Sequence, residues 1–363
     1  MGKALYRNKT IPVLFASLVY LFSLLAGIGV ISVEFSSLLL AGVISVMFLL
    51  IAIVEEVYWL DLWLIFFNLL IVILTGQLNL IFPSLLLMSN RIIAKFNYNS
   101  QTIKKILLII TTIFAIIVLL YLLIGFNQRA DIEMWRIDEL ISRKALGFVH
   151  PNVCMLSYLA ICLFYLVYLF FTYKEKPKRN RQLLLVLLLV GSTIWLYQQT
   201  LSRTTAIIVI IGMISYLIRG QKIMKDNVFL YRVMSCFPII LFILSLFVLW
   251  LPINDVVDEL LSGRVTLYKS FFQNSGFTLL GNSQLETAMF DNSYLQMILT
   301  KGIVYSVFFL INMYIILSRG KNKSELLSIL LMMVLAIGFT ETVFSKLELW
   351  IPILFLLNSR VEE

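Results

Sequence analysis

The clearest shortage in this sequence of 363 residues is charge. Only 13% of the residues are charged, whereas 61% are hydrophobic and the mean hydropathy is +0.96. A soluble domain carries about 25% charged and about 45–50% apolar residues. A soluble fold of this length has no interior large enough for the excess apolar surface. The composition therefore excludes a water-soluble protein and predicts segments that lie in lipid.

Histidine, cysteine and nucleotide-binding motifs are also scarce or missing. The single histidine excludes a metal site of the usual histidine-rich kind, and no cofactor is expected. Cys154 and Cys162 would lie about 12 Å apart along one helix, which is too far for a disulfide. The sequence contains no GxxxxGK[ST] motif and no GxGxxG between a strand and a helix. ATP hydrolysis is therefore excluded.

Apolar segments recur along the whole chain. They predict an all-α polytopic membrane protein with about 12 transmembrane helices, in a single membrane domain of residues 1–363. The predicted spans are 11–31, 36–54, 57–76, 78–90, 106–126, 150–172, 183–199, 204–218, 229–251, 294–317, 326–343 and 348–359. The fourth and the last are short and contain Pro83 and Pro352, so both full spans and re-entrant segments fit them.

Basic residues are distributed unevenly between the two sides of these spans. With the N-terminus inside, 20 of the 29 lysines and arginines lie on the inner side and nine on the outer side. This bias predicts that both termini are cytoplasmic. It also explains the net charge of +9 without nucleic acid as a partner, because the inner charges lie against anionic lipid headgroups.

Two long loops, 127–149 and 252–293, are predicted on the outer side, whereas the inner loops are too short to hold a nucleotide-binding domain. Long ordered loops in compact proteins are usually functional. Polar clusters gather in or beside these outer loops. They are Arg143 with His150-Pro151-Asn152, Ser202-Arg203-Thr204, Gly263-Arg264, Asp291-Asn292-Ser293-Tyr294 and, near the outer end of the eleventh span, Glu341.

Three of these clusters stand where a helix begins on the outer side. Pro151 suits a first helical position, Arg203 begins the eighth span, and Asp291-Asn292-Ser293 can cap the tenth. Helix N-termini carry unpaired N–H groups and partial positive charge, and guanidinium groups match phosphate oxygens. The pattern predicts a site for an anionic group at the level of the outer headgroups, such as a lipid pyrophosphate.

Each candidate also has a simpler interpretation. His150 and Asp291 are each suited to a helix cap, and Arg203 to a contact with lipid headgroups. Tyr268 and Tyr294 suit either sugar stacking or the aromatic belt of the membrane interface. An ionisable residue at the depth of Glu341 is a functional candidate, although an ion pair with an outer arginine also fits.

The order and spacing of these motifs resemble a known family. Arg143 precedes Leu-Gly-Phe-x-His-Pro-Asn; Ser-Arg-Thr, Gly-Arg, Gly-Phe-x-Leu-Leu-Gly and Asp-Asn-Ser-Tyr follow in turn. From Arg143 to Tyr294 the chain is similar to the Wzy-type polysaccharide polymerases of Gram-positive capsule and exopolysaccharide clusters, which are related to the O-antigen ligases. Ligases place a key histidine in the later large loop, where this chain has none.

The resemblance implies a GT-C-like fold and an inverting, metal-independent glycosyltransferase. Such an enzyme joins oligosaccharide repeat units, carried on undecaprenyl pyrophosphate as donor and acceptor, on the outer side of the bacterial cytoplasmic membrane. A flippase and a chain-length regulator would be its protein partners. The implied sites are His150, Asp291 and Glu341 for catalysis; Arg203, Arg264, Arg143 and Ser202 for pyrophosphate; and Asn152, Tyr268, Asn292 and Tyr294 for the sugars.

Three other functions remain open from the sequence. A ligase that transfers glycan to another acceptor is hardly separable from a polymerase. A lipid-linked oligosaccharide flippase would carry cations at mid-membrane depth and would often show an internal repeat, and neither is evident here. A non-catalytic scaffold would leave the outer cluster of arginines unexplained.

Overall fold

The computed structural model describes residues 9–54, 57–136, 139–173, 179–219, 228–250, 258, 263–285, 290–320 and 324–359. Its helices are α2 (Thr10–Gly27), α3 (Val33–Val54), α4 (Trp59–Thr75), α5 (Phe82–Lys95), α6 (Ser100–Ile124), α7 (Pro151–Tyr173), α8 (Arg179–Thr200), α9 (Arg203–Arg219), α10 (Val228–Phe247), α12 (Arg264–Ser275), α13 (Ser293–Thr300), α14 (Gly302–Ser318), α15 (Glu325–Ile337) and α16 (Leu347–Asn358). A 3-10 turn, Leu78–Ile81, precedes α5, and two strands, β1 (Ile132–Arg136) and β2 (Glu139–Arg143), pair antiparallel.

The helices have the length and surface of membrane helices. Within the described chain, five are long and apolar enough to cross a membrane, namely α2, α3, α6, α7 and α8. Shorter apolar helices (α4, α9, α10, α14, α15 and α16) stand among them. Large apolar side chains such as Ile53, Ile73 and Leu123 are exposed on the outside of the bundle. Exposed apolar surface on this scale belongs in lipid rather than in water. The chain therefore has the architecture of a membrane-embedded helical protein.

The predicted spans agree with the helices in position, with two differences. Each of the twelve predicted segments falls on helix, but the tenth is divided into α13 and α14 at Lys301. The β1–β2 hairpin within loop 127–149 and helix α12 within loop 252–293 were not predicted. How many of the shorter helices cross the membrane completely stays a prediction. The predicted termini and loop 252–293 lie partly outside the described residues.

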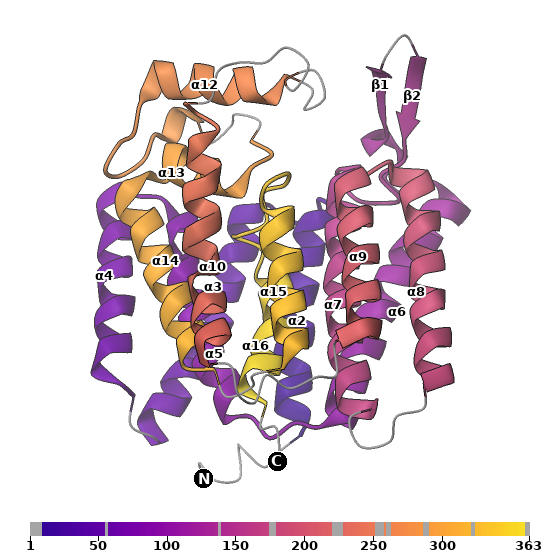
Figure 1. Ribbon diagram of the computed structural model, residues 1–363, viewed down its shortest axis with the longest axis horizontal. Helices are drawn as coiled ribbons and strands as arrows, with labels where there is room; N and C mark the ends of the chain where they lie inside the picture. The colour runs from indigo at the N-terminus through magenta and orange to yellow at the C-terminus, as the bar shows by residue number, and fades with distance from the viewer. Residues whose placement is uncertain are drawn as a thin grey trace.

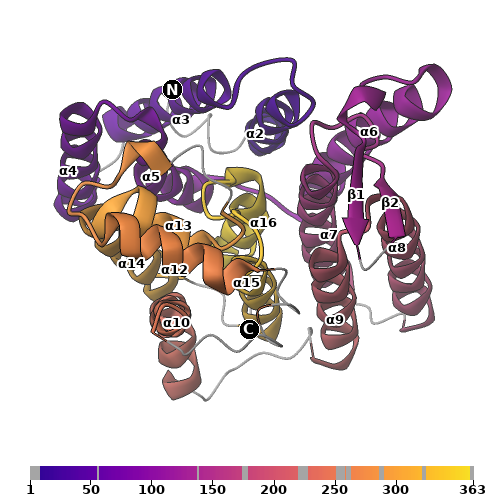
Figure 2. The same ribbon diagram turned by 90° about the horizontal axis from the view of Figure 1, so that it is seen from above.

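Two helices form the centre of the bundle. Of the apolar window in α7, 83% is buried, against 28–39% for the other four long helices. Helix α16 is short, yet it is buried from Leu347 to Leu357, including the large side chain of Trp350 in its first turn. Seen from above, α6, α8 and α9 gather round α7, while α5, α10, α14 and α15 lie on the side of α16 (Figure 2). Helices α2, α3 and α4 present exposed apolar side chains, such as Leu14, Leu49 and Ile73, to the surroundings.

The irregular segments gather at one end of the bundle. The hairpin rises from this end and α12 lies across it, whereas the two described ends of the chain lie at the opposite end (Figure 1). We call the first end the hairpin face and the second the terminal face. This separation agrees with the predicted arrangement, in which both long loops lie on one side and both termini on the other.

The division of the tenth span gives the second long loop a place to dock. Gly302 has a φ of +88° and Gly281 a φ of +93°, and a Cβ on either would collide with backbone of the other segment. Three backbone bonds join the segments: Asn282 N–H to Thr300 O (2.8 Å), Ile303 N–H to Thr278 O (3.0 Å) and Val304 N–H to Leu279 O (3.1 Å). The Gly-Phe-x-Leu-Leu-Gly stretch therefore fastens the loop to the bundle, which positions α12 over the hairpin face.

Candidate functional site

Arg143 is held at the base of the hairpin, where β2 ends. The loop after it is fixed by Asp131, whose carboxylate accepts hydrogen bonds from the Ala145 N–H (2.7 Å) and the Tyr121 hydroxyl (2.6 Å). The Arg143 guanidinium then reaches two partners on other segments. Its Nε donates to the Thr200 carbonyl (2.8 Å) and its Nη2 donates to Asn152 Oδ1 (2.5 Å). Arg143 is thereby aligned along the ends of α8 and α7.

Asn152 connects Arg143 to Glu341. Its Nδ2 donates to Glu341 Oε1 (2.6 Å), across 189 residues of sequence. Glu341 lies in the loop that follows α15, and Ser293 fixes that loop: its hydroxyl donates to the Glu341 carbonyl (2.6 Å) and accepts from the Val343 N–H (2.8 Å). The carboxylate is therefore positioned both through its side chain and through its backbone.

A second pair approaches Glu341 from α12. Arg264, at the first position of α12, pairs with Asp291 through its Nη2 and Oδ2 (2.9 Å), and the Asp291 N–H donates to the Tyr268 hydroxyl (3.3 Å). The Tyr268 ring is buried and stacks on Phe290, at 6.1 Å between centroids. Both Arg264 and Asp291 act electrostatically on Glu341. The two long loops and the α15–α16 loop therefore converge on one polar cluster.

Burial and a neighbouring carboxylate raise the pKa of Glu341. Desolvation and the nearby Asp291 carboxylate raise the pKa of Glu341 to about 7, against the weaker opposing effects of Arg264, the Asn152 hydrogen bond and Arg143. A carboxyl group with this pKa is partly ionised at neutral pH. It can accept or release a proton there, which an ordinary glutamate cannot do efficiently.

His150 has the geometry of a helix cap. Its Nδ1 accepts a hydrogen bond from the Asn152 N–H (3.1 Å), at the start of α7. Burial and the Arg143 charge lower the pKa of His150, although Asp291 acts in the opposite direction. The imidazole is therefore neutral at pH 7, and because Nδ1 accepts, its proton lies on Nε2. In this tautomer His150 offers a donor rather than a base, which supports its simpler interpretation.

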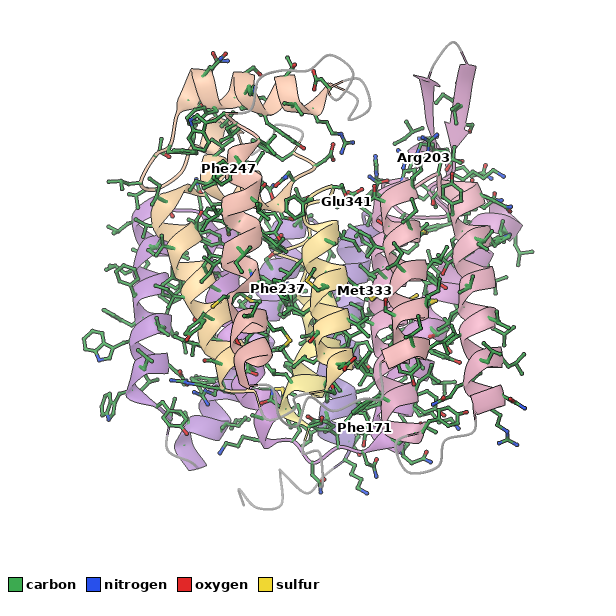
Figure 3. The ribbon with its side chains drawn as sticks, viewed as in Figure 1. Phe171, Arg203, Phe237, Phe247, Met333 and Glu341 are labelled. Carbon is green, nitrogen blue, oxygen red and sulfur yellow. The ribbon has the colours of Figure 1, made fainter. Side chains whose placement is uncertain are left out.

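Arg203 and Ser202 lie beside this cluster. Arg203 is exposed at the first position of α9, and Figure 3 shows it at the same end of the bundle as Glu341. Ser202 is buried next to the Thr200 carbonyl that anchors Arg143. Within the part of the chain that the structure describes, no hydrogen bond or ion pair joins the Arg203 side chain to the other candidates.

Three of the predicted sugar contacts have other surroundings. Asn292 is buried, and its Oδ1 accepts from the backbone N–H groups of Tyr294 and Leu295, so the cap of α13 is Asn292 and not Asp291. Tyr294 is fully buried, with its hydroxyl bonded to the Leu335 carbonyl (3.0 Å). Tyr268 likewise presents its hydroxyl to protein backbone. The polar groups of these three side chains are bonded to protein backbone, so their contact with sugar stays a prediction.

The sequence did not predict the roles of two residues that position Glu341. Ser293 was predicted only as part of a cap, but it holds the Glu341 loop. Asn152 was predicted to contact sugar, but it bridges Arg143 and Glu341. The local sequence carries no signal for either contact, because each depends on a segment far away in the chain.

Comparison with protein-family models, with curated proteins and with solved structures gives no match for this chain. Its fold and site must therefore be interpreted from their own geometry. They define a membrane-embedded helical protein with a cluster of arginines, carboxyl groups and one asparagine at a single end of the bundle.

Proposed function

We propose that this protein is a membrane glycosyltransferase that polymerises oligosaccharide units carried on a lipid pyrophosphate, with the hairpin face as the extracytoplasmic side. The observation that carries the proposal is the convergence of Arg143, Arg264, Asp291 and Glu341, from three distant segments, on one cluster at the helix ends. The expected undecaprenyl pyrophosphate would bring its diphosphate to this level of the membrane.

The charges of the cluster favour a diphosphate. In and beside the cluster, Arg143, Arg203 and Arg264 contribute three positive charges, against one each from Asp131 and Asp291 and a partial one from Glu341. The ion pair of Arg264 with Asp291 engages one nitrogen of a group that has five N–H donors. An excess of guanidinium at the edge of an apolar bundle stabilises the negative charge that develops on a departing pyrophosphate.

Glu341 is the group best suited to act as the base. In the proposed reaction, the acceptor hydroxyl oxygen bonds to the anomeric carbon of the donor as the bond from that carbon to the pyrophosphate oxygen breaks. The electron pair leaves with the pyrophosphate, and the hydroxyl proton passes to Glu341. A base with a pKa near the working pH typically contributes about 10²–10⁴-fold to such a rate. His150 is less suited, because its proton lies on Nε2.

The distribution of charge does not favour a transporter. In the described chain, the buried charged side chains are Asp61, Lys301 and Glu348, each within a turn or so of a helix end. A flippase for anionic lipids would carry cations along the middle of its helices. The geometry supports transfer chemistry at one face instead.

Reconstitution with the lipid-linked repeat unit tests the proposal. The purified protein in lipid nanodiscs should convert that unit into a ladder of longer lipid-linked products. Arg264→Ala should abolish the ladder, whereas Arg129→Ala, which removes an exposed arginine from the same face, should leave it intact. Transfer to a different acceptor would identify a ligase. Translocation without any product would refute the enzymatic proposal.

A further inference from the structure

A second polar cluster lies at the other end of the bundle. Asp61 stands in the first turn of α4, Arg91 near the end of α5, and Arg319 directly after α14. The Asp61 carboxylate is fully buried and receives both guanidinium groups: Arg91 binds Oδ2 through Nε, and Arg319 Nη1 lies 2.8 Å from Oδ1. We call these three residues the Asp61 triad.

The triad carries more positive than negative charge. Both of its guanidinium groups also lie against the ring of Tyr58, at 4.5 Å for Arg91 and 5.2 Å for Arg319. Two cations therefore share one carboxylate and one aromatic ring, which leaves a net charge of +1. The two guanidinium groups bind different oxygens of the carboxylate, so the contact links α4 to both α5 and α14, but within the triad one positive charge has no counter-charge.

Arg91 also lacks an acceptor for part of its guanidinium. Its Nη2 is buried, and none of the described residues accepts a hydrogen bond from it. A buried donor that has lost water without gaining a partner is costly, and such groups in native proteins are usually satisfied by a bound molecule or ion. The side chains of Arg91 and Arg319 are 18% and 34% exposed, so the cluster is open to one side.

We infer that the Asp61 triad binds a phosphate group at the terminal face, and that an anionic phospholipid headgroup is its occupant. The fork of a guanidinium group matches phosphate oxygens, and two forks that share one carboxylate retain donors for a second anion. Trp59 and Trp63 are exposed beside the triad, as aromatic side chains are at the membrane interface. The excess of basic residues predicts this face to be cytoplasmic, where anionic lipids attract cations.

The binding of phosphatidylglycerol to the purified full-length protein tests this site. Native mass spectrometry in an equimolar mixture of phosphatidylglycerol and phosphatidylcholine should show selective retention of the anionic lipid. Arg319→Gln makes the triad neutral and should reduce that retention about fivefold, in line with the contribution of one basic side chain near a charged surface. Lys104→Gln is the matched control, because it removes an exposed cation from α6 on the same face; its retention should stay normal.

A variant with the opposite charge change separates binding from a purely structural role. Asp61→Asn raises the charge of the triad to +2 and should increase retention of the anionic lipid in protein that remains folded. If the triad is only a link between α4, α5 and α14, both substitutions lower thermal stability and neither changes lipid selectivity. That result, or an equal loss in Arg319→Gln and Lys104→Gln, would overturn the inference.

Thermal unfolding with added phosphate identifies the source of the anion. Stabilisation of the delipidated protein by phosphatidylglycerol, but not by inorganic phosphate, shows that the headgroup is the ligand. Equal stabilisation by inorganic phosphate, lost in Arg319→Gln, shows a phosphate site without lipid specificity. No stabilisation by either anion contradicts the site. This test is independent of glycosyl transfer, because the triad and the hairpin-face cluster lie at opposite ends of the bundle.

Discussion

Replacement of Glu341 by glutamine distinguishes two effects of this carboxyl group: its contribution to turnover and its effect on the stability of the fold. Glutamine keeps the shape of the side chain and an oxygen that can accept the Asn152 hydrogen bond, but it removes the titratable proton. If Glu341 is the base, turnover should fall by about 10²–10⁴-fold. In the wild type, the rate should rise with pH up to about 7 and then level off, because only the ionised form accepts a proton.

The same substitution should stabilise the protein at high pH. The pKa of Glu341 is about 7 in the fold, whereas an ordinary glutamate has a pKa of 4.5, so folding opposes its ionisation. Stability is therefore lost as the pH rises from about 4.5 to 7, and the loss is complete above 7. A pKa raised by this amount lowers the free energy of unfolding by about 3 kcal/mol at pH 8 and by less than about 1 kcal/mol at pH 5. Glutamine does not ionise, so Glu341→Gln avoids this cost.

Thermal unfolding in detergent at pH 5 and pH 8 measures the difference. Glu341→Gln should unfold at a clearly higher temperature than the wild type at pH 8 and at nearly the same temperature at pH 5. Glu133→Gln, the same chemical change at an exposed position of β1, should follow the wild type at both pH values. A Glu341→Gln protein that is less stable than the wild type at pH 8 would show that the carboxylate is ionised and favourably paired, and the reasoning would fail.

Further substitutions test the surroundings of Glu341. Asn152→Ala removes a hydrogen bond that lowers the Glu341 pKa, so the acidic limb of the pH–rate profile should move to higher pH; an unchanged limb would exclude Glu341 as its source. His150→Ala should cost about 1 kcal/mol of stability as a lost cap and keep turnover within about tenfold; a much larger loss of turnover in stable protein would make His150 catalytic. Ser293→Ala leaves a buried N–H unpaired and should cost about 1–3 kcal/mol in a chemical unfolding experiment. Arg203→Lys should lose most product if bidentate contact with phosphate matters; full activity would show that charge is sufficient.

Hydropathy determined where the helices lie because a backbone in lipid must satisfy its own hydrogen bonds. It did not predict the break at Lys301, since apolar residues continue on both sides of it, and only the approach of Gly281 to Gly302 explains the break. The β1–β2 hairpin was missed for a related reason. Strand pairing depends on the packing of cross-strand partners, which a short polar loop does not display in its sequence.

The residue types of the site were also evident in the sequence, since the charged residues of so apolar a chain stand out at the predicted helix ends. The contacts between these residues were not evident in the sequence. Which arginine meets Asp291, and that Asn152 lies between Arg143 and Glu341, depends on how helices from distant parts of the chain pack together. The burial of Asn292 and Tyr294 was not predicted either, because a motif does not show which way a helix is rotated.

The sequence by itself thus determined which segments of this protein enter lipid and which polar groups stand at their ends, because the transfer of side chains between water and lipid is a local property. Only the tertiary structure decided that Glu341 is partly buried near a second carboxylate and that two arginines share Asp61. Electrostatic effects fall off over a few ångströms, so they depend on neighbours in space rather than on neighbours in sequence.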